Sequence, residues 1–240
     1  MSYDDDNNLA KDTKNIVAIG ASATGSDNVI QDLGTDYATQ DALTSQVIKI
    51  SCANANDTSN GSGARTVLLS GYDSNYNPQS EVISLNGQTA VNSTKSYILV
   101  RQLEVLTAGT GGTNAGIIYA GIGTVTTGVP ATKYLSIVAA TGSTRTGIYI
   151  VPDGYSMVVT GATINNRTAT NACTVKLWVK PYGGVYLQKL SINSFGTSHV
   201  ELNRTYVIPE RSLVKITGNN ATSTSTMSIV VDFRLVKDLD

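Results

Sequence analysis

The stretch from Gly63 to Gly87, GARTVLLSGYDSNYNPQSEVISLNG, is the part of the sequence that best predicts the fold. Two apolar runs, Thr66–Leu69 and Val82–Leu85, flank a segment rich in Asp, Asn and Pro. Such spacing is typical of a β-hairpin with a longer loop. We therefore expect the two runs to pair with one face buried, and Asn86-Gly87 to supply the next turn.

Short β-patterns of the same kind recur along almost the whole chain. Clusters of Gly, Ser, Thr and Asn separate them, helical periodicity is scarce, and no repeat of fixed period is present. We expect strands within 45–51, 65–72, 81–85, 97–106, 116–122, 133–140, 147–151, 156–164, 174–180, 185–192, 199–203, 213–218 and 227–236. The sequence therefore predicts an all-β fold, an antiparallel β-sandwich of jelly-roll-like type.

Two of these patterns make local predictions. In Thr174–Lys180 the apolar residues alternate with polar ones, and the single tryptophan, Trp178, falls on the polar face. In Tyr97–Leu106 the alternation breaks near Arg101, which indicates a bulge or a strand that changes sheets.

Two Pro-containing turns have the same design. Val151–Gly154 (VPDG) and Ile208–Arg211 (IPER) each combine a strand end, a proline that stops the ladder, a turn and a new apolar strand. In jelly-roll sandwiches such turns lead the chain from one sheet to the other, and we expect that role here.

The chain divides into a polar arm and a β-rich body. Residues 1–14 are acidic and without periodicity, which predicts a flexible arm that orders against a partner. Residues 15–240 form the sandwich, and a composition shift at Thr141–Thr146 leaves two alternatives, a single sandwich or two lobes, 15–141 and 142–240. The N-terminus lacks the features of a signal peptide, and no apolar run is long enough to span a bilayer.

Composition argues against several classes of partner. Charged residues make up 15% of the chain and the net charge is −1, so no long-range field attracts nucleic acid or acidic membranes. The two cysteines, Cys52 and Cys173, each adjoin a strand pattern, and we interpret them as buried thiols. A bridge between them is the alternative.

Candidate catalytic and metal sites are weak. The only histidine, His199, has no nucleophile signature around it, and the four acids of the strand region, Glu81, Glu104, Glu201 and Glu210, are scattered. The segment 73–81 has oxygen ligands at alternate positions like a calcium loop, yet Pro78 replaces the required Gly, so a hairpin loop held by Asx turns is the better interpretation. The run 109–116 lacks the Gly-Lys-Ser/Thr of a phosphate loop and predicts a mobile loop. We predict no catalytic residues, no metal and no cofactor.

Aromatic side chains are mostly tyrosine, twelve against two Phe and one Trp. Tyrosines of this kind line carbohydrate or protein contacts, and they are also common on half-exposed strands. The residues that we select as candidates for partner binding, from the arm and from the aromatic set, are Tyr3, Asp4, Asp5, Asp6, Leu9, Tyr76, Trp178 and Tyr182.

The order of these motifs resembles a group of virion proteins of tailed bacteriophages. The resemblance rests on GARTV-x-x-x-GYDSNYN-x-x-SE-x-x-x-LNG-x-T-x-V, on VLTAGTGGTNAGII at 105–118, and on YIVPDGY at 149–155 with VIPER at 207–211. It covers roughly Arg65–Val236 and has no active-site signature. It implies a β-sandwich subunit, often trimeric, located on the capsid or in tail and fibre structures.

This resemblance implies a non-enzymatic structural role in the virion. The first hypothesis is a head decoration or cement subunit that binds the major capsid protein or other virion proteins as a homotrimer. The second is a tail or fibre component that binds a host receptor or a glycan. The third is a glycan-processing enzyme, which requires two converging acids.

Overall fold

The structure, a computed structural model, describes residues 14–22, 28–29, 38, 40–166, 172–220 and 225–238. All elements of that part of the chain are β-strands, and all their pairings are antiparallel. The predicted all-β antiparallel fold is confirmed. The jelly-roll-like connection of the strands is a finer statement and stays a prediction. A search of the described residues for a helix long and apolar enough to cross a membrane finds none.

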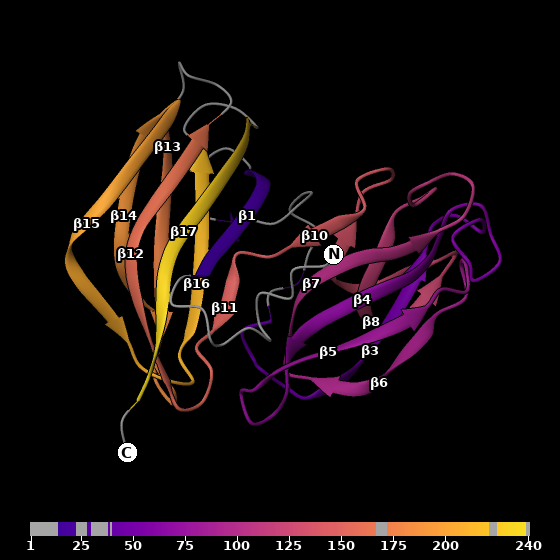
Figure 1. The fold of residues 1–240 in the computed structure, drawn as a ribbon, viewed down its shortest axis with the longest axis horizontal. Helices are drawn as coiled ribbons and strands as arrows, with labels where there is room; N and C mark the ends of the chain where they lie inside the picture. Colours follow the sequence, from indigo (N-terminus) through magenta and orange to yellow (C-terminus); the bar gives the residue numbers. More distant parts are fainter. Residues whose placement is uncertain are drawn as a thin grey trace. The chain divides into compact units, whose positions relative to one another are not determined.

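The chain folds as two compact units, which are described separately (Figure 1). Unit 1 contains the described residues from 38 to 145. Unit 2 contains the described residues from 14 to 29 and from 146 to 238. Unit 1 is therefore inserted into the sequence of unit 2. The predicted arm, residues 1–14, lies outside the described residues except for Lys14, with which the first strand begins.

Unit 1 consists of two four-stranded sheets that enclose one hydrophobic core. Their orders are β10-β7-β4-β5 and β6-β3-β8-β9. The core contains side chains of both sheets, among them Ile50, Leu69, Leu103 and Leu135. The strands are β3 (Gln46–Cys52), β4 (Ala64–Tyr72), β5 (Pro78–Ser84), β6 (Val91–Tyr97), β7 (Leu99–Ala108), β8 (Ile118–Thr126), β9 (Val129–Ile137) and β10 (Ser143–Arg145).

The predicted hairpin is strands β4 and β5. Val67 pairs with Ile83 and Leu69 with Glu81, and Val67, Leu69 and Ile83 are buried whereas Val82 is 59% exposed. Pairing and one-sided burial are therefore confirmed. The break in alternation near Arg101 is also confirmed as a bulge, because the pairing of β4 with β7 steps from Gln102 to Val100.

Unit 2 also has two sheets around a core. Their orders are β1-β17-β12-β15 and β11-β16-β13-β14, and β2 pairs with β16 beside the second sheet. Buried side chains such as Val159, Val175, Ile216 and Phe233 come from both sheets. The strands are β1 (Lys14–Ser22), β2 (Asn28–Val29), β11 (Ile148–Ile150), β12 (Tyr155–Asn166), β13 (Ala172–Lys180), β14 (Leu187–Phe195), β15 (Thr197–Ile208), β16 (Leu213–Asn220) and β17 (Ser225–Lys237).

Two local predictions in unit 2 are confirmed. Buried and half-buried residues alternate along β13, with Trp178 on the half-buried face. The Val151–Gly154 turn joins β11 to β12, and the turn after Ile208 joins β15 to β16; each pair of strands lies in opposite sheets. Both Pro-containing turns therefore carry the chain between sheets, as the sequence predicts.

Candidate binding surface

The residues predicted to bind a partner fall in three places. Tyr3, Asp4, Asp5, Asp6 and Leu9 lie outside the described residues. Tyr76 lies in the β4–β5 loop of unit 1, where it is half-buried. Trp178 on β13 and Tyr182 after it lie in unit 2, and Tyr182 is 64% exposed. Within unit 2, Trp178 and Tyr182 are therefore close in sequence, whereas Tyr76 belongs to the other unit.

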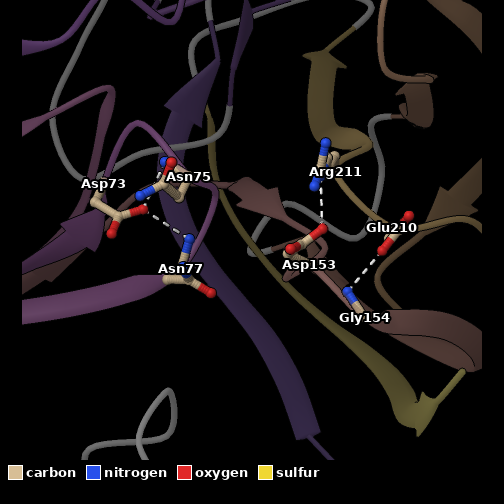
Figure 2. Close-up of polar contacts among 7 residues, drawn as sticks. All are labelled: Asp73, Asn75, Asn77, Asp153, Gly154, Glu210 and Arg211. Carbon is tan, nitrogen blue, oxygen red and sulfur yellow. Dashed lines mark hydrogen bonds and ion pairs between the residues drawn. The ribbon is translucent and has the colours of Figure 1, made fainter.

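The β4–β5 loop is a tight Asx turn. One carboxylate oxygen of Asp73 accepts hydrogen bonds from the backbone N–H groups of Asn75 at 2.8 Å and Asn77 at 2.9 Å (Figure 2). Tyr76 sits between them in the left-handed region, with φ of 66°. The Asp73 carboxylate is thus used to hold the turn, as the hairpin interpretation predicts.

The acid at the far end of that segment also has structural partners. The Glu81 carboxylate accepts from the backbone N–H and the hydroxyl of Thr94, from the backbone N–H of Lys95 and from the Tyr97 hydroxyl. Partial burial alone would raise the pKa of Glu81, but these hydrogen bonds outweigh it and lower the pKa. In the described part of the chain, no group of three or more His, Cys, Asp or Glu side chains has the geometry of a metal site.

The two Pro-containing turns of unit 2 are clamped to each other (Figure 2). The Arg211 Nε donates to the Asp153 carboxylate at 2.6 Å, and the Gly154 N–H donates to the Glu210 carboxylate at 2.6 Å. The hydrogen bond from Arg211 lowers the pKa of Asp153. Arg211 has φ of 54°, so a strained backbone places its guanidinium at the turn.

Cations and aromatic rings gather near the same end of unit 2. The Arg211 guanidinium lies 5.6 Å from the Tyr182 ring centre. The ammonium groups of Lys215 and Lys180 lie 3.9 Å and 5.8 Å from the centre of the Tyr186 ring. Two cations thus approach a single aromatic ring, an arrangement that suits an anionic or an aromatic partner.

Trp178 extends this surface along the outer face of the sheet. It pairs with Lys215 across β13 and β16, its indole N–H donates to the Thr217 hydroxyl at 2.9 Å, and Lys176 lies 6.0 Å from its ring. We call Trp178, Lys180, Tyr186, Arg211 and Lys215 the basic aromatic cluster.

His199 lies on β15 with two polar neighbours. Its Nδ1 is 2.8 Å from the Thr163 hydroxyl, and its Nε2 is 3.9 Å from the Glu201 carboxylate. The His199 and Glu201 side chains are 55% and 84% exposed. Solvent therefore competes for each contact, and the arrangement lacks the water-excluded environment that activates a nucleophile.

Asp57, a fully buried acid of unit 1, is absent from the candidates predicted by sequence. It is fully buried, and its carboxylate accepts from the backbone N–H groups of Ala64, Ala115 and Gly116 at 2.7–2.8 Å. It thereby ties the segment after β3 to the segment before β8. Its position in a polar run, AsnAlaAsnAspThr, gives no local signal for this role.

The Gly-rich segment 109–116 is held in place. Gly109 and Gly111 donate backbone hydrogen bonds to Gly63 and Ser62, and a side chain at Gly109 would meet the Gly61 carbonyl oxygen at 2.2 Å. Asn114, also buried, donates to the carbonyls of Gly116 and Val138. The interpretation of this segment as a mobile loop is therefore corrected: its glycines permit close backbone approach.

Both cysteines are buried free thiols, as predicted. Cys52 lies on β3 in unit 1 and Cys173 on β13 in unit 2. Burial, reinforced by the charge of Asp57, raises the pKa of Cys52 to about 12. Burial also raises the pKa of Cys173. Neither thiol has the depressed pKa of a reactive cysteine.

Comparison with protein-family models finds no match, and comparison with curated proteins finds none. Two solved viral structures align with 94% of this chain at 8% identity. The infectious bursal disease virus VP2 subviral particle has a TM-score of 0.21 with 77% of its chain covered, and the Gx strain of that virus has a TM-score of 0.18 with 81% covered. Likeness at this level carries no argument about fold or function.

Proposed function

We propose that this protein is a non-enzymatic structural component of a virus particle, specifically a decoration subunit that binds repeated sites on a phage head. The single observation that carries the proposal is the strand pairing of unit 2. Setting aside the two-residue β2, the first strand pairs with the last, β1 with β17, and the second with the second-to-last, β11 with β16. The next two pairs, β12 with β15 and β13 with β14, continue the nesting.

Nested pairing of eight strands in two sheets supports a jelly-roll connection. Viral capsid and lectin domains are among the proteins built this way. A fold of this kind hosts many functions, so it supports the role by analogy and joins the sequence resemblance to virion proteins as a second, separate reason.

Hydrogen bonds hold the loops at one end of unit 1 in place. This supports a binding role in which these loops need little further ordering when a partner binds. The buried Asp57 carboxylate and the buried Asn114 amide fix three chain segments at the same end of the unit. A preorganised surface loses little conformational entropy on binding. Weak contacts of such a surface, repeated by particle symmetry, sum to stable attachment.

The positions of the acids support the non-enzymatic part of the proposal. Asp57, Glu81 and Asp153 each accept hydrogen bonds that hold turns or strands together. An acid in such a role has its lone pairs directed at structural donors rather than at a substrate.

Immunogold electron microscopy of particles with an antibody against the purified chain tests the proposal. We expect label over the head. We also expect a solution mass three times the 25.2 kDa of one chain, as a homotrimer requires. Absence of label from every part of the particle would refute a virion role.

A second candidate is a tail or fibre component that binds a host glycan or receptor. The observation in its favour is the exposed Tyr182 ring beside Arg211 and the neighbouring Tyr186 and Trp178. Label confined to the tail, together with loss of host-cell binding in Tyr182→Ala, would favour this candidate. Retained cell binding in that variant would count against it.

A further inference from the structure

Strand β15 ends one sheet of unit 2, and residues 197–201 form the regular part of its outer edge. Within the described residues, no strand pairs with β15 on the side away from β12. The His199 and Glu201 side chains on this stretch are exposed. An edge strand of this kind offers its backbone N–H and C=O groups to another strand.

Two edges of unit 1 carry features that discourage such pairing. Strand β5 begins with Pro78, and β6 contains Lys95. The Glu81 carboxylate of β5 also accepts hydrogen bonds from Thr94 and Lys95 of β6. Residues 197–201 contain neither proline nor lysine. The edge of β15 therefore lacks the protection that these two edges have.

The register of β12 with β15 shows which backbone groups point to the open edge. The Asn166 N–H donates to the carbonyl of Gly196, the residue just before β15. Hydrogen-bonded and non-hydrogen-bonded pairs alternate along an antiparallel ladder, so Thr197, His199 and Glu201 occupy non-hydrogen-bonded pairs with β12. The backbone N–H and C=O groups of these three residues therefore point away from β12.

These positions allow β15 to pair with β15 of a second copy of the chain. Antiparallel pairing of a strand with itself is two-fold symmetric, and hydrogen bonds form only where outward-pointing residues meet. A two-fold axis at Val200 satisfies this condition. It places His199 of each copy directly opposite Glu201 of the other.

Charge distinguishes this register from its neighbours. An axis at His199 would place two imidazoles opposite each other, and an axis at Glu201 would do the same with two carboxylates. An axis at Ser198 would place His199 opposite Thr197. Among these, only the axis at Val200 brings a basic and an acidic side chain together on both of its sides. Opposite charges directly across a ladder stabilise the pairing, and like charges destabilise it.

The residue on the axis adds an apolar contact. Val200 is half-buried and occupies a hydrogen-bonded pair with Ala162 of β12, so it would face its counterpart in a non-hydrogen-bonded pair. Cα atoms in such pairs are about 4.5 Å apart, which brings the two side chains close together. Two β-branched side chains in this position pack against each other.

The paired stretch is short. The register of β12 with β15 breaks after Glu201 and resumes at Tyr206. Residues 199–201 of each copy can therefore pair, with about two backbone hydrogen bonds for each pair of His199 with Glu201. A contact of this size is weak by itself, and it gains strength where many copies are held close together.

We propose that residues 199–201 of β15 form a two-fold contact between two copies of this chain. The two strands pair antiparallel about Val200, and the His199 imidazole of each copy contacts the Glu201 carboxylate of the other. The proposal goes beyond the virion role and does not depend on it, since the same contact joins two single chains or two trimers.

Disulfide trapping in the full chain tests the contact. Val200→Cys places a thiol on the axis, where a Cα separation of about 4.5 Å lies within the range of a disulfide. Ser198→Cys is the matched control, because Ser198 is also half-buried on the same face of β15. In the proposed register it lies roughly 13 Å along the strands from its counterpart.

We expect V200C to form a two-chain band on a non-reducing gel about tenfold faster than S198C, because the contact raises the effective concentration of the paired thiols. Both are oxidised with glutathione disulfide at about 0.5 mM chain. The native Cys52 and Cys173 are buried, and burial raises the pKa of both thiols. The wild-type chain should therefore give no such band while its units stay folded.

Exchange of charge between two chains tests the contacts of His199 with Glu201. At about pH 6, where histidine side chains commonly carry charge, H199E/V200C and V200C/E201K should each cross-link about fivefold more slowly than V200C, because like charges then face each other. An equimolar mixture should give an excess of the mixed dimer, which a size tag on one variant separates. Asp232 lies near His199 across Gly161 and repels a carboxylate at position 199 within one chain. The mixture controls for this effect, because the effect is the same in either dimer.

Three results would overturn the proposal. These are equal cross-linking rates of V200C and S198C, a mixture without excess mixed dimer, and no two-chain band from V200C. Melting curves check that each variant is folded. If V200C does not fold, a mixture of H199E and E201K without the cysteine decides by sedimentation velocity. A mass that rises on mixing supports the contact, and an unchanged mass overturns it. Immunogold labelling does not depend on this contact, so the two proposals fail separately.

Discussion

The two units differ in the hydrogen bonds that join their two sheets at one corner, where an edge strand of one sheet is followed by an edge strand of the other. In each, two consecutive edge strands lie in opposite sheets: β5 and β6 in unit 1, β14 and β15 in unit 2. In unit 1 the Glu81 carboxylate joins β5 to Thr94, Lys95 and Tyr97 of β6, and the Gln79 amide donates to the Ser96 carbonyl. Charge-assisted hydrogen bonds therefore close that corner.

The described residues at the corresponding corner of unit 2 are joined by hydrogen bonds between neutral groups. Only Gly196 separates β14 from β15, and the Ser194 hydroxyl donates to the Ser198 hydroxyl at 2.7 Å. Phe195 and Val207 are 65% and 59% exposed on these strands. A small apolar hollow of about 10 Å³ lies between the sheets of this unit, lined by residues such as Leu190 and Ile192 of β14. The corner of unit 1 is thus joined by hydrogen bonds to a carboxylate, whereas the described corner of unit 2 is joined by a hydrogen bond between two neutral hydroxyl groups.

Two cysteines and one tryptophan allow the stability of the two units to be measured separately. Cys52 is the buried thiol of unit 1, and Cys173 and Trp178 belong to unit 2. Since burial raises the pKa of both thiols, each reacts only when its unit opens. The rate of thiol labelling therefore measures the stability of each unit separately.

The largest expected effect is the loss of Asp57. Asp57→Ala removes the acceptor of three backbone N–H groups, of which that of Ala64 is buried and those of Ala115 and Gly116 are part-buried. Each buried donor left unsatisfied costs about 1–3 kcal/mol and a part-buried one costs less, so we expect unit 1 to lose roughly 3–5 kcal/mol. Labelling of Cys52 should accelerate by at least a hundredfold, while Trp178 emission and Cys173 labelling stay as in the wild type.

Asp73→Ala is the matched control, because Asp73 also accepts from backbone N–H groups in unit 1 but in an exposed turn. It should cost about 1 kcal/mol or less, since water replaces the lost acceptor. Equal destabilisation by the two substitutions would show that burial of Asp57 is not what makes it important.

The next effect concerns the closed corner of unit 1. Glu81→Gln should destabilise this unit by roughly 1–2 kcal/mol through loss of charge-assisted hydrogen bonds. Since the folded state lowers the pKa of Glu81, its contribution is present above the ordinary pKa of 4.5 and is lost as the pH falls through the lower pKa of the folded state.

The difference between wild type and Glu81→Gln in denaturation midpoint should therefore be largest near neutral pH and vanish on acidification. Ser194→Ala at the corresponding corner of unit 2 replaces a neutral hydrogen bond and should cost about 1 kcal/mol without this pH dependence. A pH-independent loss in Glu81→Gln would show that the charge of Glu81 contributes nothing.

Local sequence patterns predicted most of the strands in both units and missed others, such as β6. The alternation of β13 and the pairing of β4 with β5 follow from residues near each other in sequence. Strand β6, with the sequence VNSTKSY, has no apolar alternation because only Ser93 and Tyr97 of this edge strand are buried. Its polarity, which hides it from pattern analysis, is also what lets it bond with Glu81.

Strand pairs and hydrogen bonds between residues far apart in the sequence could not be predicted, for a physical reason. The pairing of β1 with β17 joins the two ends of the chain across the inserted unit 1, and no local pattern specifies it. The same holds for Asp57, whose three donors come from segments as far as Gly116. Of the candidate binding residues, Trp178 and Tyr182 share one region of unit 2 because both adjoin the end of β13, which is a local relation.

The smallest expected effect is at the clamp between the Pro-containing turns of unit 2, and it sharpens the contrast with Asp57. The Arg211 and Asp153 side chains are 39% and 38% exposed, so their ion pair stabilises little. The left-handed φ of 54° at Arg211 opposes any residue with a Cβ. Arg211→Gly should therefore melt within about 2 °C of the wild type, and Arg211→Ala roughly 3 °C below Arg211→Gly, by calorimetry. The contrary result is that both variants melt equally far below the wild type. In that case the ion pair, and not the backbone conformation, sets the stability of this turn. Exposed charges in unit 2 would then stabilise the fold as the buried Asp57 carboxylate does in unit 1.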